Sequence, residues 1–328
     1  MSVRVLSGED VRAALTMREC IEAMDTVLRE LAAGELYLPL RSVVRPPKSP
    51  GLMGLMTAHR AGAQPAFGLK AVAIFPENPT RGLDAHQGVV VVFDGDDGHV
   101  TGLLDASAVT AIRTAAVSAV ATRALAREGA ATLAVLGAGV QAAAHIEAMA
   151  CVVPLERVRI YSRRPEPARK LAAETGERYG IDASAAGSVE EALRDAAVVV
   201  TTTTAREPIV ERAWLGPGTH VNAVGSSIPT ARELDGATMA AARIVVDARE
   251  SATNESGDIL LAQREGALAH DLELIELGEV LSGSARGRTG ADELTVFVSL
   301  GLAVEDLAAA ELALRVAAAA GLGVEVPL

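Results

Sequence analysis

Apolar runs separated by segments of helical spacing fill the middle and later part of the chain. They lie at residues 131–136, 158–161, 197–203, 220–224 and 243–247. Strands that alternate with helices predict a parallel sheet. The strands of such a sheet are buried on both faces, so they read as continuous apolar runs. The pattern predicts an α/β fold with a Rossmann dinucleotide-binding domain over residues 119–297.

The first part of the chain has a different pattern. An amphipathic helix is expected over residues 11–33, and a long helix follows Asp105, a suitable N-cap, and runs through 111–127. Between them we predict strands at residues 54–57, 66–75, 88–93 and 100–104. A C-terminal helix over 302–320 is expected to pack back on this α+β part. We therefore divide the chain into residues 1–118, 119–297 and 298–328.

The acidic segment 94–98 joins the last two of these strands. Its acids have a spacing that could suggest a calcium loop. The segment is short and ends in Gly98, which a hairpin turn explains better. We predict a turn and no metal site.

A glycine turn follows the first apolar run, in the segment L-G-A-G-V-Q-A of residues 136–142. Gly137 lets the chain bend sharply, Gly139 leaves no Cβ beside a pyrophosphate, and Ala142 lets the helix pack on the strand. The amino end of that helix would present N–H groups to the phosphates. We assign cofactor binding here to Gly137, Gly139, Val140 and Gln141.

The end of the second strand indicates which nucleotide is preferred. An NAD-preferring domain places Asp or Glu there to hold the ribose 2′-hydroxyl. This chain has Ser162, Arg163 and Arg164 instead, and two guanidinium groups suit a 2′-phosphate. NADP(H) is favoured. NAD(H) stays possible if the arginines are ordinary surface charges.

Three cations stand in apolar surroundings. Lys70 is the only polar residue in its run, and Arg113 is the only charge between Asp105 and Arg123. A buried ammonium needs an anion, and a guanidinium with an ammonium can grip a carboxylate. Arg41 begins another apolar run and has the weakest case. The alternatives are an edge-strand lysine for Lys70 and a snorkelling arginine for Arg113.

Composition narrows the class of protein. Half of the residues are hydrophobic, but no apolar stretch approaches the roughly 20 residues of a membrane span, and the N-terminus lacks the apolar core of a secretory signal. We expect a cytoplasmic location. A net charge of −12 argues against nucleic-acid partners. Cys20 and Cys151 have no C-x-x-C or zinc-like spacing, so both are expected to be buried.

Eight segments together resemble the ornithine cyclodeaminase/mu-crystallin family over nearly the whole chain. They are L-R-S-V-V, G-L-K-A-V, D-A-H-Q-G, I-R-T-A-A-V-S-A, L-G-A-G-V-Q-A, N-A-V-G-S-S-I-P-T-A-R-E-L-D, E-S-G-D-I-L and T-V-F-V-S-L-G-L-A-V-E-D. The resemblance implies a homodimer whose first domain, with the C-terminal helix, forms the substrate pocket. It implies a carboxylate clamp of Arg41, Lys70 and Arg113, and it places His86 near the pocket. Without the family resemblance, we would interpret His86 as a hydrogen-bonded histidine in a loop.

One departure bears on the reaction. The cyclodeaminases of this family carry an aspartate shortly after the N-A-V-G strand, whereas this chain has Gly225-Ser226-Ser227. A serine is no base at neutral pH without help. Glu233 and Asp235 lie further on and are expected to point elsewhere. The pattern is closer to the mu-crystallin type, whose members reduce ketimines.

The resulting hypothesis is an NADPH-dependent reductase of cyclic imino acids such as pyrroline-2-carboxylate or piperideine-2-carboxylate. Lys70 and His86 are the candidate catalytic residues, Arg41, Lys70, Arg113 and Ser227 the substrate-binding ones, and Thr203 and Val224 further cofactor contacts. The alternatives are an ornithine cyclodeaminase, an amino-acid dehydrogenase of the alanine type, and a non-catalytic protein that binds NADP and a small ligand.

Overall fold

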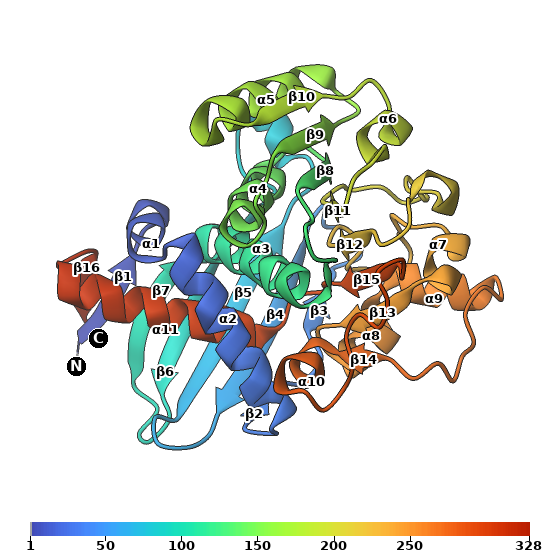
Figure 1. The fold of residues 1–328 in the computed structure, drawn as a ribbon. Coiled ribbons are helices and arrows are strands. Elements are labelled where there is room, and N and C mark those ends of the chain that lie inside the picture. The colour runs from blue at the N-terminus through green and yellow to red at the C-terminus, as the bar shows by residue number, and fades with distance from the viewer. Residues whose placement is uncertain (1) are drawn as a thin grey trace. The chain divides into compact units, whose positions relative to one another are not determined.

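The computed structural model describes residues 2–328, apart from the side chain of Pro79. The chain divides into two units (Figure 1). The first runs from the N-terminus to Arg113 and resumes at Gly301, and the second is Thr114–Leu300. The sequence analysis placed the corresponding divisions at residues 118 and 297.

The sheet of the second unit is parallel throughout its described strands. Its order is β10 (Asp182–Ala185), β9 (Arg157–Tyr161), β8 (Thr132–Leu136), β11 (Val198–Thr201), β12 (His220–Ala223), β15 (Thr295–Val298), β13 (Arg243–Val246) and β14 (Ile275–Glu276). The chain crosses from β8 to β9 in one direction and returns to β11 on the other side of β8. This reversal is the switch point at which Rossmann folds bind dinucleotides.

This sheet confirms the predicted parallel strands. The residues of β8, β11, β12 and β15 are almost entirely buried, as strands covered on both faces must be. Strands β10, β14 and β15 were not predicted from the sequence. β10 and β14 are short and partly polar, so they lack the apolar run that identified the others.

Helices cover the second unit's strands. They are α4 (Val140–Val152), α5 (Pro165–Tyr179), α6 (Val189–Leu193), the short 3-10 turn η2 (Arg212–Trp214), α7 (Gly236–Ala241), α8 (Arg249–Glu255), α9 (Gly257–Arg264) and α10 (Leu277–Ser282). Cys151 in α4 is only half-buried, so the expectation that both cysteines are buried is wrong for it.

The first unit contains the mixed sheet. Its order is β16 (Val324–Pro327), β1 (Ser2–Leu6), β7 (Val100–Asp105), β6 (His86–Asp94), β5 (Ala66–Ile74), β4 (Leu52–Arg60) and β2 (Leu36–Tyr37), and β3 (Ser42–Val44) also pairs with β4. The four predicted strands are confirmed as β4 to β7, and the acidic segment is the predicted turn between β6 and β7. β5 lies in the interior of this sheet, between β4 and β6.

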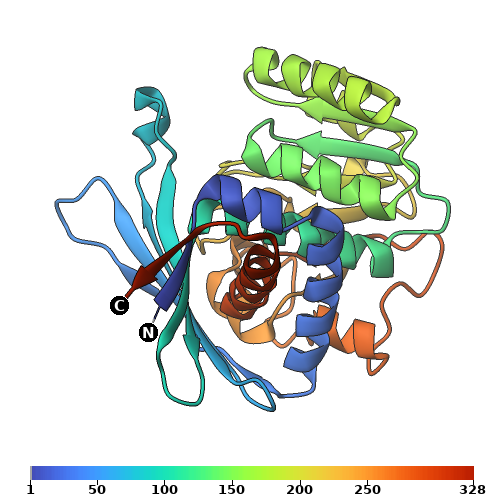
Figure 2. The same ribbon diagram turned by 90° about the vertical axis from the view of Figure 1, so that its left-hand side faces the viewer.

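One face of this sheet is covered by α11 (Ala303–Ala320), which α1 (Gly8–Ala14) and α2 (Met17–Ala32) flank. Figure 2 shows α11 end-on between the sheet and α2. The contact is close because two strand residues are glycines. A Cβ at Gly68 would lie 3.0 Å from the Leu307 Cβ, and one at Gly102 would lie 2.4 Å from Leu314.

The single helix expected over residues 11–33 is wrong, because the chain forms α1 and α2 instead. Thr16 lies between them in an extended conformation and accepts a hydrogen bond from the Glu19 amide, so it begins a new helix. The chain also forms a short 3-10 helix, η1 (Asn78–Arg81), and the long helix α3 (Ala106–Leu125). It is long and apolar enough to span a membrane, but most of it is buried, as in a core helix. Asp105 caps it by accepting from the Ala108 amide at 2.7 Å, as predicted.

The other face of the first unit's sheet is apolar and open. Met53, Phe67 and Val89 have side-chain exposures between 43% and 47%, and each alternates along its strand with residues that face α11. Exposed apolar side chains on one face of a sheet make that face a candidate for an interaction surface.

Candidate active site

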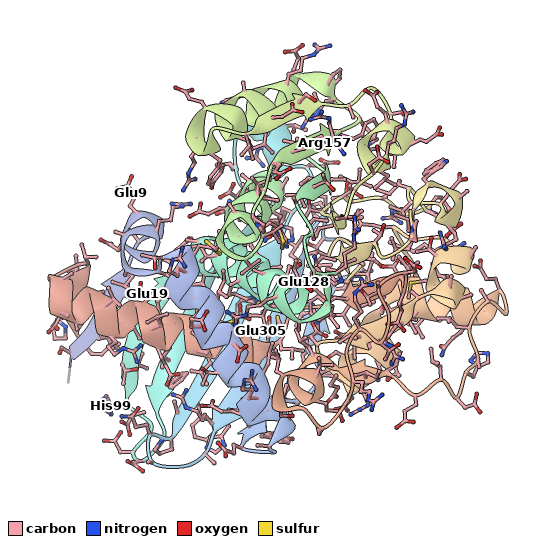
Figure 3. All side chains as sticks on the ribbon, viewed as in Figure 1. Glu9, Glu19, His99, Glu128, Arg157 and Glu305 are labelled. Atoms are coloured by element: carbon pink, nitrogen blue, oxygen red, sulfur yellow. The ribbon has the colours of Figure 1, made fainter. Side chains whose placement is uncertain are left out.

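Four charged side chains form a buried cluster inside the first unit. Lys70 Nζ lies 2.7 Å from Asp306 Oδ2, Arg113 Nε lies 2.8 Å from Asp306 Oδ1, and Arg113 Nη1 lies 2.7 Å from Glu305 Oε2. All four side chains are at most 4% exposed. Figure 3 labels Glu305 on α11, among the side chains over the sheet.

The elements explain this meeting. Lys70 extends from the interior strand β5 on the face that carries Gly68, which is the face covered by α11. Arg113 lies on α3, and Glu305 and Asp306 stand in the first turn of α11. Leu302 donates its backbone N–H to Glu305 Oε2 at 3.1 Å, so Glu305 also caps α11.

Burial and charge set the protonation of the cluster. Burial lowers the pKa of Lys70 to about 8, and the Asp306 carboxylate opposes that fall. Burial acts to raise the pKa of Asp306, but the charges of Arg113 and Lys70 hold it below its usual value. Asp306 is therefore ionised near neutral pH, and Lys70 can change its protonation state in the range where enzymes work.

Arg41 belongs to the same neighbourhood. Its Nη2 donates to the carbonyl oxygen of Gly301 at 3.1 Å, and its charge adds to the lowering of the Lys70 pKa. Gly301 has φ +78°, and a Cβ there would lie 2.6 Å from Arg113 Nη1. The glycine therefore lets the chain lie directly against the guanidinium.

The cluster brings cations together. Lys70 and Arg113 both lie beside Asp306, and Arg41 is close enough for its charge to lower the pKa of Lys70. Ammonium and guanidinium groups are the side chains that bind carboxylates.

The structure decides between the alternatives left open for these cations. Lys70 is 4% exposed on an interior strand, so it is not an edge-strand lysine in solvent. Arg113 is 3% exposed, so it is not a snorkelling surface arginine. Their partners, Glu305 and Asp306, were not predicted. The signal that could have identified them is two adjacent acids at the start of a largely apolar C-terminal helix.

His86 begins β6 on the face that carries Lys70, since the register pairs Ile74 with His86 and Lys70 with Val90. Its ring reaches solvent. Partial desolvation and the Lys70 charge lower the pKa of its ring, so the ring is neutral near pH 7. The backbone of His86 is held by Ser107 Oγ, which donates to the His86 carbonyl oxygen at 2.7 Å.

The second unit carries the glycine turn. Gly137 has φ +121°, and its N–H donates to the Tyr161 carbonyl at 2.8 Å. A Cβ there would lie 2.5 Å from Thr202 Oγ1, whereas a Cβ at Gly139 would meet nothing within 4 Å. Gly139 is the N-cap of α4 and lacks a side-chain cap. These features leave the amino end of α4 open to a phosphate, and Val140 beside it is 67% exposed.

Ser162, Arg163 and Arg164 follow β9, the strand next to β8. Arg163 and Arg164 are exposed, and Arg164 occupies the N-cap position of α5 without a side-chain cap bond. Both guanidinium groups are therefore available to a ligand at this end of the sheet.

The segment after β12 differs from the sequence-based expectation. Glu233 does not point elsewhere: it is fully buried, and its Oε2 accepts the Gly225 N–H at 2.8 Å. Burial raises the pKa of Glu233 to about 7, against its hydrogen bonds to Thr201 and Thr203. Asp235 caps α7 by accepting from the Thr238 amide, so for Asp235 the expectation is correct. Ser227 is partly exposed beside this segment.

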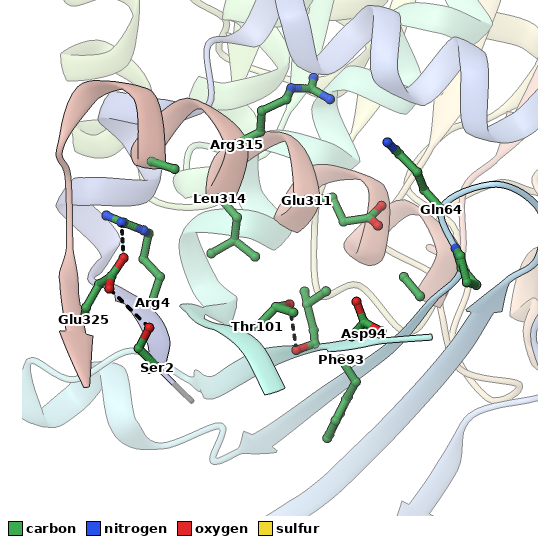
Figure 4. A pocket seen from close by; sticks show the side chains of 14 residues that line it. Ser2, Arg4, Gln64, Phe93, Asp94, Thr101, Glu311, Leu314, Arg315 and Glu325 are labelled. Atoms are coloured by element: carbon green, nitrogen blue, oxygen red, sulfur yellow. Dashed lines mark hydrogen bonds and ion pairs between the residues drawn. The ribbon is translucent and has the colours of Figure 1, made fainter. Parts of the chain in front are cut away.

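A groove of about 420 Å³ lies elsewhere in the first unit, beside β1, β6 and α11 (Figure 4). Several of its charged groups already have partners. Arg4 and Ser2 both bond Glu325, and Glu311 pairs with Arg60. It contains none of the predicted site residues, so the buried cluster is the better candidate site.

The comparisons with known proteins agree with this description. The family model for the ornithine cyclodeaminase/mu-crystallin family matches residues 1–319. The chain is 40% identical to the mouse ketimine reductase mu-crystallin over 311 residues, covering 94% of this chain and 95% of the relative. It is similar to the Thermococcus litoralis Δ1-pyrroline-2-carboxylate reductase solved with NADH and L-proline, with a TM-score of 0.95, 35% identity and coverage of 99% and 100%. It is also similar to an archaeal alanine dehydrogenase dimer with bound NAD, with a TM-score of 0.93, 32% identity and full coverage of both chains.

Proposed function

The chain belongs to the ornithine cyclodeaminase/mu-crystallin family, and from this premise we propose that it is a nicotinamide-dependent oxidoreductase that reduces cyclic imino acids. The substrate class is pyrroline-2-carboxylate or piperideine-2-carboxylate, and the products are L-proline or L-pipecolate. The observation that carries the proposal is the buried meeting of Lys70 and Arg113 at Asp306, with Arg41 near Lys70, which is a set of cations suited to a carboxylate. Relatives that act on ketimines and pyrroline-2-carboxylate support it.

Three cations hold the substrate carboxylate in this proposal. Arg113 is fixed by Glu305 and Asp306, so its orientation is set before substrate arrives. Lys70 and Arg41 add charge, and the planar fork of an arginine suits a carboxylate. A substrate held by its carboxylate presents its C=N carbon in a fixed direction, and such orientation supplies several kcal/mol of rate enhancement.

The imine nitrogen must gain a proton during reduction. Lys70, with its pKa near 8, is charged at neutral pH and can donate a proton. His86 is neutral there and would relay one from solvent, and a bound water is the third source. We propose Lys70 as the donor because it lies within the cluster that would hold the carboxylate and because its pKa is about 8.

The dinucleotide would be held by the carboxyl ends of the second unit's strands. Gly137, Gly139, Val140 and Gln141 would receive the pyrophosphate, and Thr203 and Val224 would lie near the nicotinamide. When bound, the reduced nicotinamide supplies the hydride. Solved relatives contain NADH or NAD. We propose that this chain prefers NADPH because Arg163 and Arg164, and no carboxylate, follow β9.

Ring closure with loss of ammonia is less favoured. It needs an acidic side chain near the end of β12, where this chain has Gly225-Ser226-Ser227. Glu233 and Asp258 both reach this segment, but both are fully buried, and Glu233 is bound to backbone and hydroxyl donors, so we propose neither as the acid that ring closure needs. Ser227 can orient a water or the substrate but has no pKa suited to proton abstraction.

We propose further that the chain forms a homodimer through the open apolar face of the first unit's sheet. A solved relative is a dimer, and Met53, Phe67 and Val89 would be covered. Phe67→Glu should give a monomer in analytical ultracentrifugation. A dimer of unchanged stability in that variant would show that this face is not the interface.

A spectrophotometric screen tests the function. NADPH and NADH are each supplied with pyrroline-2-carboxylate and piperideine-2-carboxylate, and L-ornithine, L-proline and L-alanine are supplied with the oxidised nucleotides. We expect rapid NADPH oxidation with the cyclic imines and no ammonia from ornithine. Tight nucleotide binding without turnover of any substrate would favour a binding protein, and stoichiometric ammonia and proline from ornithine would restore the cyclodeaminase.

A further inference from the structure

A buried carboxylate joins the segments that follow two neighbouring strands of the second unit. We propose that Glu233 is a positioning residue that fastens the ends of β11 and β12 into one rigid edge of the dinucleotide site. This inference deepens the proposed function and rests on the Rossmann site assigned there.

The hydrogen bonds of Glu233 divide evenly between its two oxygens. Oε1 accepts both the N–H and the hydroxyl of Thr203, at 2.8 and 2.6 Å. Oε2 accepts the Thr201 hydroxyl at 2.6 Å and the Gly225 N–H at 2.8 Å. One side chain therefore joins Thr201 at the end of β11, Thr203 beyond it and Gly225, the second residue after β12.

A carboxyl group satisfies this arrangement because each of its oxygens faces one backbone N–H and can accept from it. A glutamine would turn its NH₂ group toward the N–H of either Thr203 or Gly225. In both orientations a backbone donor would lose its acceptor and meet a second donor, which is costly in a buried site.

Glu233 is itself held in place. Asp258 Oδ1 accepts the backbone N–H groups of both Glu233 and Leu234 at 2.9 Å, and the Glu233 carbonyl accepts the N–H groups of Ile209 and Val210. The position of the carboxylate is therefore set by the scaffold and not by the segments that it joins.

The segment after β12 is shaped around this carboxylate. A Cβ at Gly225 would lie 2.3 Å from the Thr203 carbonyl oxygen and 2.6 Å from the Glu233 Cδ, so a larger residue would separate the two segments. Ser226 Oγ donates to the Ala231 carbonyl at 2.6 Å and closes the loop between them.

The position of these Glu233 hydrogen bonds in the sheet indicates their function. Ligands of open α/β sheets bind beyond the carboxyl ends of the strands, and Thr203 and Val224 lie just beyond the carboxyl ends of β11 and β12. Preorganised edges lower the ordering cost of binding. Glu233 acts through these residues and does not contact the nucleotide.

The experiment compares Glu233→Gln with a matched control, Leu193→Ala, which removes a buried core side chain of α6 in the same unit. Amide hydrogen exchange of residues 202–206 and 223–227 and the dissociation constants for NADPH and NADP+ are measured at equal distance below each variant's melting temperature. We expect Glu233→Gln to speed exchange in both segments and weaken both nucleotides, each by about tenfold or more. Leu193→Ala should leave both quantities near wild type.

Unchanged amide hydrogen exchange in Glu233→Gln would refute the proposal that Glu233 holds the two segments together. Unchanged affinity for NADPH and NADP+ would refute its role in the dinucleotide site. If that variant does not fold, Thr201→Val, which removes one donor, should show a smaller change in the same two segments. Nucleotide binding is measured without imino acid, so a wild-type protein that binds NADPH but reduces no imine would refute the proposed function and leave this inference standing.

Discussion

Replacing Asp306 by asparagine tests the buried cluster most directly. Asp306 lies 2.7 Å from Lys70 Nζ and 2.8 Å from Arg113 Nε, and all three side chains are nearly inaccessible to solvent. Asp306→Asn removes the negative charge and keeps the shape. We expect two separate consequences, one for stability and one for the pH dependence of turnover.

The magnitude follows from the two contacts. At an effective dielectric of about 20, unit charges about 4 Å apart attract by about 4 kcal/mol, and removing one partner of a buried pair costs about 3 to 5 kcal/mol of stability. A nearby opposite charge shifts a pKa by about 1 to 3 units. Asp306 raises the pKa of Lys70 against burial, so its loss moves the Lys70 pKa further below 8.

The assay is kcat/KM for NADPH oxidation with pyrroline-2-carboxylate between about pH 6 and pH 10, because this ratio reports the pKa values of the free enzyme. If protonated Lys70 is required, activity falls as pH rises through its pKa. We expect that fall near pH 8 in the wild type and at least about one unit lower in Asp306→Asn. Urea unfolding measures the loss of stability.

The control is Glu305→Gln. Glu305 bonds Arg113 but not Lys70, so this variant should lose stability while its alkaline fall in kcat/KM stays near pH 8. A fall at the same pH in Asp306→Asn, Glu305→Gln and the wild type would refute the requirement for protonated Lys70, since the substrate's own titration is common to all three.

Three further predictions address other parts of the molecule. Changing Arg163 and Arg164 to Ala should raise the dissociation constant of NADPH about tenfold or more, because a charge-assisted contact is worth about 1.5 to 3 kcal/mol, and should leave that of NADH within about twofold. Arg169→Ala on α5 is the control. Equal losses of affinity for both nucleotides would show that Arg163 and Arg164 do not bind the 2′-phosphate. Gly301→Ala should lower kcat/KM for the imine about tenfold or more, because the added Cβ would lie 2.6 Å from Arg113 Nη1. Gly321 is the control position, since it has a similar positive φ but a Cβ there would meet nothing within 4 Å. Comparable activity losses in Gly301→Ala and Gly321→Ala would indicate that backbone strain alone causes the loss. Burial lowers the pKa of His145 to about 4, so between pH 6.5 and pH 4 the unfolded state binds a proton that the folded state does not, and the protein loses stability as the pH falls. His145→Gln should reduce that loss between pH 7.5 and 4.5 by about 2 to 3 kcal/mol in urea unfolding. A variant with the same pH dependence of stability as the wild type would contradict the burial of a neutral His145 ring.

Much of the second unit could be predicted from the sequence because its signals are local. A strand buried on both faces needs a continuous apolar run, and the glycine turn needs residues without side chains at Gly137 and Gly139. The same logic identified Lys70 and Arg113, since an isolated cation in an apolar run needs a compensating anion. The division of residues 11–33 into α1 and α2 was also local, at the Thr16 cap, but an unbroken apolar periodicity concealed it.

The tertiary structure decided which charges meet. Asp306 is far from Lys70 in the chain, and only the packing of α11 on the sheet brings the carboxylate to the ammonium; no spacing within the sequence encodes that distance. Glu233 shows the same limit. Asp235, two residues further on, caps a helix, while Glu233 turns inward to donors at Thr201 on β11, Thr203 beyond β11 and Gly225 beyond β12. The sequence determined which residues could not remain unpartnered, and the fold determined their partners, because the cost of burying a charge is a property of the residue and the compensation is a property of the arrangement.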